Sequence, residues 1–334
     1  MEFLYEIKKT LYNRIVFVGR FLGKEGLRDM LSFKCKNCGG ETSVDSSGSL
    51  YCEYCGSKFN FQDKELLEYR TFRLQMLNYL RGLHDEQMEG ESQEDSLWEH
   101  AETICYETKD GDAVNVRYLY SYDDGVATTY LTRHHALFVF SKNKRKEAER
   151  MLRGIQALSF PPADVKGLED CFPKLRGTYE LKDDGIMLTF TRTENLFPLS
   201  MFGSLTPEHV AWIISRLENI CCVLNYGGLI HGGINEESVW INPFNHHGVL
   251  MGHWWSTKRV EQAGLGTARD QDLKDVRKTA DRILGIHREE APQALTEFLR
   301  SRPGIDAYAD FEAWDRVIEV GFGGRRFAKM NVDF

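Results

Sequence analysis

Two pairs of cysteines near the start of the chain constrain its fold more than any other feature of the sequence. Cys35 and Cys38 form one Cys-x-x-Cys pair, and Cys52 and Cys55 form a second. This spacing lets both thiolates of a pair reach one ion, and four thiolates complete the tetrahedral shell that Zn²⁺ prefers. A glycine follows each pair, where the turn beside a metal favours positive φ. The pattern predicts one structural Zn²⁺ site with no coordination position left open for water.

The residues between the two pairs predict a β-hairpin. The stretch ETSVDSSGSLY (41–51) has two short strand-like runs around a turn rich in Ser and Gly. A hairpin clipped by four thiolates resembles a zinc ribbon, which we expect over residues 33–60, after a helical segment at 1–32. A segment this small buries little apolar surface, so Zn²⁺ binding of roughly 10–16 kcal/mol would supply its folding free energy. Zinc ribbons serve protein and nucleic-acid partners alike, and the nearly balanced charge of residues 1–60 does not favour DNA.

Residues 61–84 predict an amphipathic helix. Its apolar residues recur at steps of three and four, which is the spacing of one helix face: Leu66, Tyr69, Phe72, Met76, Leu80 and Leu83. Packing against a core is the first interpretation of this face, and docking onto a partner is the second. The next stretch, 85–96, is half acidic and has no basic residue. We therefore expect a solvated linker and a domain boundary there.

From residue 97 the pattern becomes that of a mixed α and β domain. Runs rich in β-branched and aromatic residues predict strands at 113–122, 125–132, 135–141, 175–183 and 185–193, with one helix at 142–158 among them. Thr206 and Pro207 then begin a long helix, which Gly227 and Gly228 end. This order of elements resembles that of a protein kinase. The resemblance implies an α+β fold with a β-rich N-lobe (97–198) and a helical C-lobe (199–334).

The sequence IHGGINEESVWINP (230–243) resembles the catalytic loop of protein kinases, H-R-D-L-x-x-x-N. On that pattern His231 takes the place of the His. Gly233 stands where the Asp base belongs, and Ser238 stands where the metal-binding Asn belongs.

Three further segments fit the resemblance by their position. GVLMGHWW (248–255) corresponds to the strand entering the D-F-G motif, whose aspartate falls at Gly252 or His253. Asp272, in the segment 272–285, corresponds to the helix F aspartate, which ties down the backbone of the catalytic loop. Residues 194–202 correspond to the hinge and the start of helix D, and an adenine slot at the hinge, near Glu194 to Pro198, needs only backbone groups and apolar walls.

The parts that phosphoryl transfer needs are missing from these positions. The reaction uses a carboxylate base, metal ligands, a lysine on the third strand and a glycine-rich phosphate loop. No Asp or Glu occurs from residue 238 to residue 260, and the strand at 135–141 has no Lys. YSYDDGVATTY (120–130), in the place of the glycine-rich loop, contains a single Gly. The resemblance therefore implies a pseudokinase with weak or no ATP binding.

Three functions are consistent with the sequence. The first is a non-catalytic, zinc-stabilised adaptor that acts through protein partners. The second is an active atypical kinase or nucleotide-binding enzyme that uses displaced acids such as Glu236 or Glu237. The third is a nucleic-acid-associated factor that acts through the zinc ribbon.

Composition and the remaining polar residues narrow these classes. The net charge of −8 argues against a protein that coats a polyanion. No apolar run reaches the length of a membrane span and no signal peptide is recognisable, so we expect a cytoplasmic protein without membrane contact.

Three histidines, His246, His247 and His253, invite a metal site, but NPFNHHG (242–248) is more typical of a hairpin turn. The other four cysteines are expected to be buried, reduced thiols: Cys105, Cys171, Cys221 and Cys222.

Overall fold

The computed structural model describes residues 33–34, 41–44, 50–52, 58–59, 64–89, 97–161, 167–262, 270–326 and 330. The chain divides into two compact units, Met1–Phe61 and Gln62–Phe334. The helical segment predicted at 1–32 lies outside the described residues, as do Cys35, Cys38 and Cys55. None of the described helices is long and apolar enough to cross a lipid bilayer.

The first unit contains a four-stranded antiparallel sheet with the strands in chain order. Its strands are β1 (Phe33–Lys34), β2 (Glu41–Val44), β3 (Leu50–Cys52) and β4 (Lys58–Phe59). Val44 pairs with Leu50 and Thr42 pairs with Cys52, so β2 and β3 form the hairpin that was predicted between the two cysteine pairs.

The second unit begins with helix α2 (Lys64–Glu89), which is longer than predicted and extends into the expected linker. Phe72, Met76 and Leu80 on one face of α2 are buried in the same core as the strands and helices that follow. Glu, Gln and Met are good helix formers, so a helix anchored by its buried face can continue through the start of the acidic stretch. The helix therefore belongs to the second unit and is not separated from it at residue 85.

The β-rich part of this unit is a five-stranded antiparallel sheet with the order β10-β11-β9-β8-β7. The strands are β7 (Tyr120–Asp123), β8 (Thr128–Leu131), β9 (His135–Phe140), β10 (Leu175–Glu180) and β11 (Ile186–Thr191). Helix α3 (Arg145–Gln156) lies between β9 and β10 in the chain. These elements confirm the predicted helix and the strands predicted at 125–132, 135–141, 175–183 and 185–193. The single strand predicted at 113–122 is instead broken at Leu119, and only its second part, β7, belongs to this sheet.

A separate two-stranded ribbon, β5 (Glu102–Glu107) paired with β6 (Ala113–Tyr118), precedes the sheet. Strand β5 was not predicted, although its sequence ETICYE contains β-branched Thr103 and Ile104 and aromatic Tyr106 between two glutamates. Its Cys105 is exposed, which corrects the expectation of a buried thiol, whereas Cys171 and Cys221 are buried.

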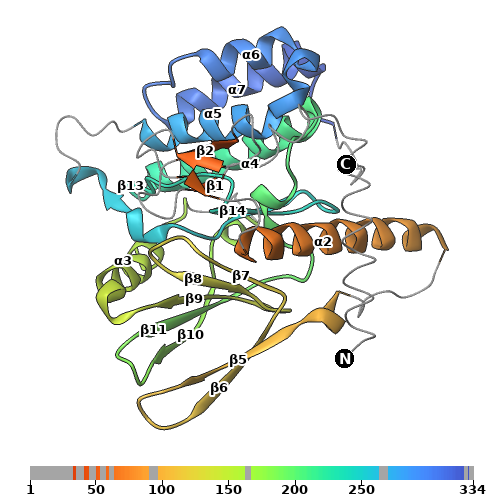
Figure 1. Ribbon diagram of the computed structural model, residues 1–334. Coiled ribbons are helices and arrows are strands. Elements are labelled where there is room, and N and C mark those ends of the chain that lie inside the picture. The colour runs from red at the N-terminus through yellow and green to blue at the C-terminus, as the bar shows by residue number, and fades with distance from the viewer. Residues whose placement is uncertain are drawn as a thin grey trace. The chain divides into compact units, whose positions relative to one another are not determined.

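The helical part follows the sheet and completes a two-lobed α+β arrangement (Figure 1). It contains α4 (Pro207–Tyr226), α5 (Gln271–Leu284), α6 (Gln293–Arg300) and α7 (Ala307–Phe322). Short strands connect these helices to the sheet: β12 (Phe197–Pro198), β13 (Leu229–Ile230), β14 (Val239–Asn242), β15 (His247–Leu250) and β16 (Lys258–Arg259). Strands β14 and β15 pair as a hairpin, which confirms the turn predicted around His246 and His247.

The core of the helical part combines large aromatic rings with one buried ion pair. Trp240, Trp254 and Trp314 are fully buried, and each indole N–H donates to an oxygen. Arg277 of α5 binds Asp310 of α7 through two hydrogen bonds of 2.7 and 2.8 Å. Bidentate geometry of this kind offsets the cost of burying both charges.

Candidate functional site

A buried aspartate holds the loop that was predicted at residues 230–243. Asp272, in the first turn of α5, accepts hydrogen bonds from the backbone N–H groups of His231 (2.8 Å) and Gly232 (2.7 Å). This is the contact that we expected of Asp272 from the sequence. Burial raises the pKa of Asp272 to about 6, against the effect of its two backbone donors. At neutral pH the group is therefore a carboxylate, and both of its oxygens accept.

His231 is fully buried and joins the loop to the segment after β15. Its Nε2 lies 3.0 Å from the carbonyl oxygen of Gly252, which can only accept, so Nε2 carries the proton. Its ring packs edge-on against Trp254 at 4.8 Å. Burial lowers the pKa of His231 to about 3, so the imidazole is neutral at physiological pH. These contacts support the loop and leave His231 no access to a ligand.

The positions expected for a base and a metal ligand have no group that can serve phosphoryl transfer. Gly233 has no side chain, and a Cβ added there would lie 3.0 Å from the Cβ of His253. The hydroxyl of Ser238 is buried; it donates to the carbonyl of Asn235 (3.1 Å) and accepts from the N–H of the same residue (2.9 Å). Both hydrogen bonds of the Ser238 hydroxyl therefore lie within the turn at 235–238.

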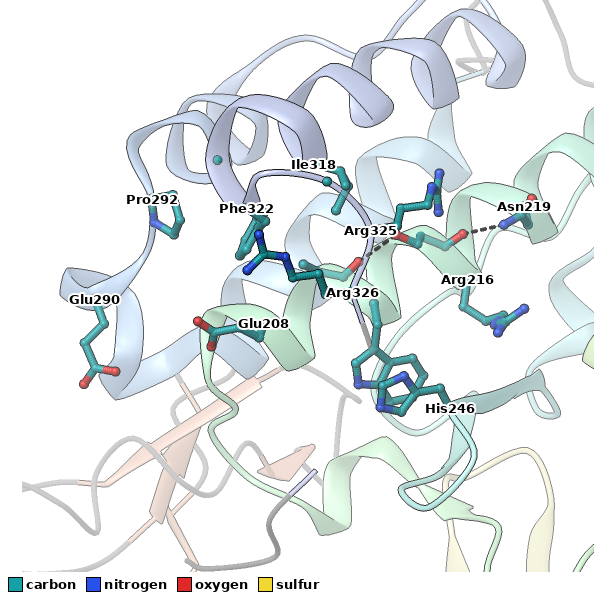
Figure 2. Close-up of a pocket in the computed structure, with 15 residues that line it drawn as sticks. Glu208, Arg216, Asn219, His246, Glu290, Pro292, Ile318, Phe322, Arg325 and Arg326 are labelled. Atoms are coloured by element: carbon teal, nitrogen blue, oxygen red, sulfur yellow. Dashed lines mark hydrogen bonds between the residues drawn. The ribbon is translucent and has the colours of Figure 1, made fainter. Parts of the chain in front are cut away.

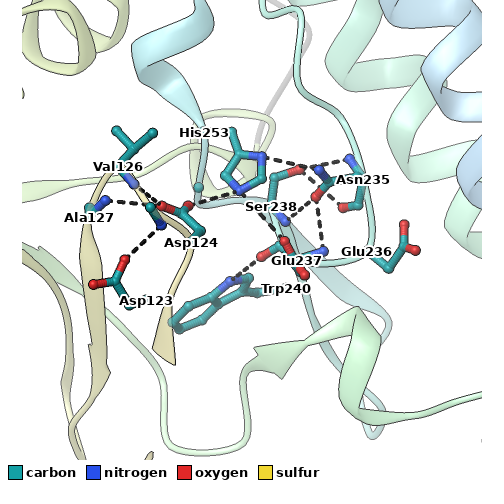
Figure 3. Close-up of polar contacts among 12 residues, drawn as sticks. Asp123, Asp124, Val126, Ala127, Asn235, Glu236, Glu237, Ser238, Trp240 and His253 are labelled. Atoms are coloured by element: carbon teal, nitrogen blue, oxygen red, sulfur yellow. Dashed lines mark hydrogen bonds and ion pairs between the residues drawn. The ribbon is translucent and has the colours of Figure 1, made fainter. Parts of the chain in front are cut away.

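His253 stands where the resemblance places a metal-binding aspartate, and its backbone is left-handed with φ of 62°. Its Nδ1 lies 3.1 Å from the amide nitrogen of Asn235, and its ring packs against Trp255 at 5.1 Å. Its Nε2 faces two carboxylates, at 3.4 Å from Asp124 Oδ2 and 4.0 Å from Glu237 Oε2 (Figure 3). Because the amide nitrogen donates to Nδ1, the proton on Nε2 points toward these acids.

Asp124 belongs to the turn between β7 and β8 and was not singled out from the sequence. Its Oδ1 accepts from the N–H groups of Val126 (2.9 Å) and Ala127 (3.0 Å), which leaves Oδ2 directed at His253. Burial raises the pKa of Asp124, but the hydrogen bonds from His253 and the two backbone groups outweigh it and hold this pKa below its ordinary value. The side chains of Asp124 and His253 are only 8% and 11% exposed. The Asp124 carboxylate therefore lies in the buried region between this turn and His253.

The Asp-Asp-Gly sequence of this turn is a recognisable signal for a side chain that caps its own turn. No sequence signal indicates that the second carboxylate oxygen reaches His253, because the two residues are far apart in the chain.

The two displaced acids that were considered as alternative bases already have partners. Glu236 Oε2 accepts from Nη2 (2.7 Å) and Nε (3.1 Å) of Arg282 on α5. Glu237 faces His253, and its backbone carbonyl accepts from the indole of Trp240.

Among the described residues, no ion pair joins Lys142 to a glutamate of α3, the pair that would correspond to the lysine and glutamate that orient phosphates in kinases. Lys142, just beyond β9, binds Asp184 at 2.8 Å on an exposed hairpin. Glu147 of α3 has a buried carboxylate oxygen without a hydrogen-bond partner in the described part of the chain. Glu149, on the same helix, is exposed.

The predicted zinc ligands are described only in part. Cys52 is the last residue of β3, and the other three ligands lie outside the described residues. Within the described ranges, no group of three His, Cys, Asp or Glu side chains is placed to hold a metal ion. His246, His247 and His253 accordingly do not converge on a common point.

A cavity of about 490 Å³ lies in the helical part, between α4 and the end of α7 (Figure 2). Arginines and glutamates both line it, and Arg216, Arg325 and Arg326 point in different directions. A site for one anion needs converging donors, which this arrangement does not supply. The cavity therefore suggests no specific ligand.

Comparisons with protein-family models and with curated proteins found no match. Similar solved structures include that of vaccinia related kinase 3, with 12% identity over 67% of this chain and 95% of that chain and a TM-score of 0.45. The Toxoplasma gondii specific rhoptry antigen kinase domain has 10% identity over 75% of this chain and 94% of that chain, with a TM-score of 0.44. WbdD has 12% identity over 64% of this chain and 49% of that chain, with a TM-score of 0.43. Identity to all three is low, and none of these similarities bears on activity.

Proposed function

We propose that residues 97–334 form a kinase-like scaffold that does not transfer phosphate and that acts through protein partners. One observation supports this most directly. The turn in the place of a glycine-rich loop contributes a carboxylate, Asp124, to a buried contact with His253, which takes the place of the metal-binding aspartate. This contact supports the proposal that protein side chains occupy the space that a kinase gives to phosphates and Mg²⁺.

The chemistry of the surrounding residues supports the same proposal. A phosphate group brings negative charge, and beneath this turn it would meet the carboxylates of Asp124 and Glu237. Phosphoryl transfer depends on cations that neutralise that charge and on a base for the acceptor hydroxyl. Gly233 cannot act as a base, and Glu236 is held by Arg282. The atypical-enzyme alternative would require Glu236 to leave Arg282 or Glu237 to leave His253.

We also propose one structural Zn²⁺ held by Cys35, Cys38, Cys52 and Cys55. In an antiparallel sheet with the order β1-β2-β3-β4, the connection from β1 to β2 and that from β3 to β4 lie at the same end. By their positions in the chain, Cys35 and Cys38 belong to the first connection, Cys52 ends β3, and Cys55 belongs to the second connection. That topology supports a shared ion, whose chemistry would be structural because thiolates fill all four positions.

Calorimetric titration with ATP, with and without Mg²⁺, tests the proposed function, beside a radiolabel transfer assay on protein substrates. We expect weak or no ATP binding, no dependence of any binding on Mg²⁺, and no transfer. Micromolar, Mg²⁺-dependent binding together with turnover that Glu236→Gln or Glu237→Gln abolishes would establish the atypical enzyme instead. Capture of a protein partner that survives high salt would support the adaptor role, whereas salt-sensitive binding to DNA or RNA would favour the nucleic-acid alternative.

A further inference from the structure

Helix α2 contacts the hinge region through a regular set of side chains on one face. Tyr69, Phe72, Arg73, Met76 and Leu80 recur at the three- and four-residue steps of a helix. Phe72, Arg73, Met76 and Leu80 are buried, and Tyr69 packs against the same core. Leu74, on the opposite face, is 44% exposed. The helix therefore presents one recognition face to the kinase-like part and one face to solvent.

The recognition face contacts the walls of the predicted adenine slot. The ring of Phe72 stacks parallel to Tyr120 of β7 at 4.8 Å and lies 6.4 Å from the ring of Phe197 in the hinge. Tyr69 packs edge-on against Tyr120 at 6.2 Å. An aromatic side chain of α2 thus lies between the hinge and the first strand of the sheet, where an adenine ring would require the same apolar walls.

The polar groups of the recognition face bind backbone acceptors just after the hinge. Arg73 Nε donates to the carbonyl of Met201 at 2.8 Å, and the hydroxyl of Tyr69 donates to the carbonyl of Ser200 at 3.1 Å. The N–H of Ser200 in turn donates to the carbonyl of Glu236 in the predicted catalytic loop, at 2.8 Å. Burial raises the pKa of Tyr69 to about 12, so its hydroxyl remains a donor at neutral pH. The helix therefore contacts the first strand of the sheet and the segment after the hinge, which itself binds the predicted loop, and it lies between the β-rich and helical parts (Figure 1).

We propose that the surface that α2 covers, formed by Tyr120, Phe197 and the backbone carbonyls of Ser200 and Met201, is a helix-binding groove. Helix α2 is its resident ligand. Its ligand class is an amphipathic helix with aromatic residues at positions i and i+3, arginine at i+4 and apolar residues at i+7 and i+11. The proposal rests on the proposed function, because a groove filled by α2 leaves the adenine slot closed. A partner that supplies a helix of this class competes with α2 for the groove.

Binding of a synthetic helix in trans tests the groove in the full chain. Leu74→Pro breaks α2 at an exposed position and leaves every groove residue unchanged, and Leu74→Ala is the matched control. The probe is a fluorescent peptide with the sequence of residues 64–89. We expect Leu74→Pro to bind the peptide, and the wild-type chain and Leu74→Ala to bind it at least tenfold more weakly. A peptide with Phe72→Ala should bind Leu74→Pro more than tenfold more weakly, since truncation of a buried aromatic anchor has effects of this size.

A second full-length variant, Arg73→Ala, removes the hydrogen bonds to the carbonyls after the hinge together with the packing of the buried Arg73 side chain, and it should also bind the peptide if Leu74→Pro does not fold. Equal binding to the wild-type chain, or no binding to either variant, would overturn the groove. ATP with Mg²⁺ is titrated into the same samples. Mg²⁺-dependent ATP binding by Leu74→Pro would refute the proposed function and leave the groove intact, so the two failures are distinguishable.

Discussion

The contact between Asp124 and His253 leads to a quantitative prediction about the turn between β7 and β8. Asp124→Asn keeps an oxygen for the N–H groups of Val126 and Ala127 but removes the charge that faces His253. His253→Asn removes the imidazole at a position with φ of 62°, a conformation that Asn tolerates. The double variant closes a mutant cycle, which isolates the energy of this one contact.

The expected coupling energy follows from burial and distance. A hydrogen bond to a charged group contributes about 1.5–3 kcal/mol, and the separation of 3.4 Å places this contact toward the lower end. We therefore expect a coupling of about 1–2 kcal/mol. Asp123→Asn is the matched control, because the adjacent Asp123 is exposed, accepts from the N–H of Gly125 and the hydroxyl of Thr128, and does not face His253. Its effect on the free energy of unfolding should stay within about 0.5 kcal/mol.

Urea denaturation of the four proteins measures the coupling, and its pH dependence supplies a second check. The folded-state pKa of Asp124 is depressed, so its contribution to stability is present above the ordinary pKa of 3.8 and is lost as pH falls through the folded value. The difference between wild type and Asp124→Asn should therefore shrink in acid below about pH 4. A coupling under about 0.3 kcal/mol, or an effect of Asp124→Asn no larger than that of Asp123→Asn, would refute the proposed filling of this space.

Two further predictions concern the metal and the buried core. Freshly purified, reduced protein should contain about one Zn²⁺ by elemental analysis, and protein without zinc would contradict this. The Cys38→Ser variant should lose the ion and unfold in the first unit, while the melting transition of the second unit changes little. Burial and the nearby Asp310 raise the pKa of Glu218 well above its ordinary value, so the folded state holds a proton that the unfolded state releases. The contribution of Glu218 to stability is full below about pH 4.5 and is lost as pH rises toward the folded pKa. Glu218→Gln should therefore raise the free energy of unfolding at pH 8, measured by urea denaturation, and reduce the slope of that free energy against pH. An unchanged slope would contradict the prediction.

The elements with strong local signals were predictable from the sequence. The strands of the five-stranded sheet are runs of β-branched and aromatic residues, and α4 begins at Thr206-Pro207 and ends before Gly227 as predicted. The contact of Asp272 with the loop followed from the resemblance, which assigns this position to the aspartate that ties down the loop backbone.

The features that required the structure depend on contacts between distant residues. The apolar spacing of α2 predicted a buried face, but it did not indicate that Phe72 would meet Tyr120 and Phe197. The acidic composition after residue 84 suggested a linker, whereas the helix continues through Glu89. Asp124 appeared to be an ordinary turn residue, and only the fold shows its second oxygen directed at His253.

The residues that match the kinase pattern differ from those that depart from it in what their side chains contact. Asp272 accepts two buried N–H groups, and His231 donates to a buried carbonyl. Each such group left unpaired would cost about 1–3 kcal/mol, so the fold of the loop requires both residues whether or not the domain transfers phosphate. The base and the metal ligand of a kinase would instead face substrate, and here Gly233 and Ser238 make contacts only within the protein. Loop shape and phosphoryl transfer thus depend on different side chains, and a kinase-like loop can persist on the first set alone.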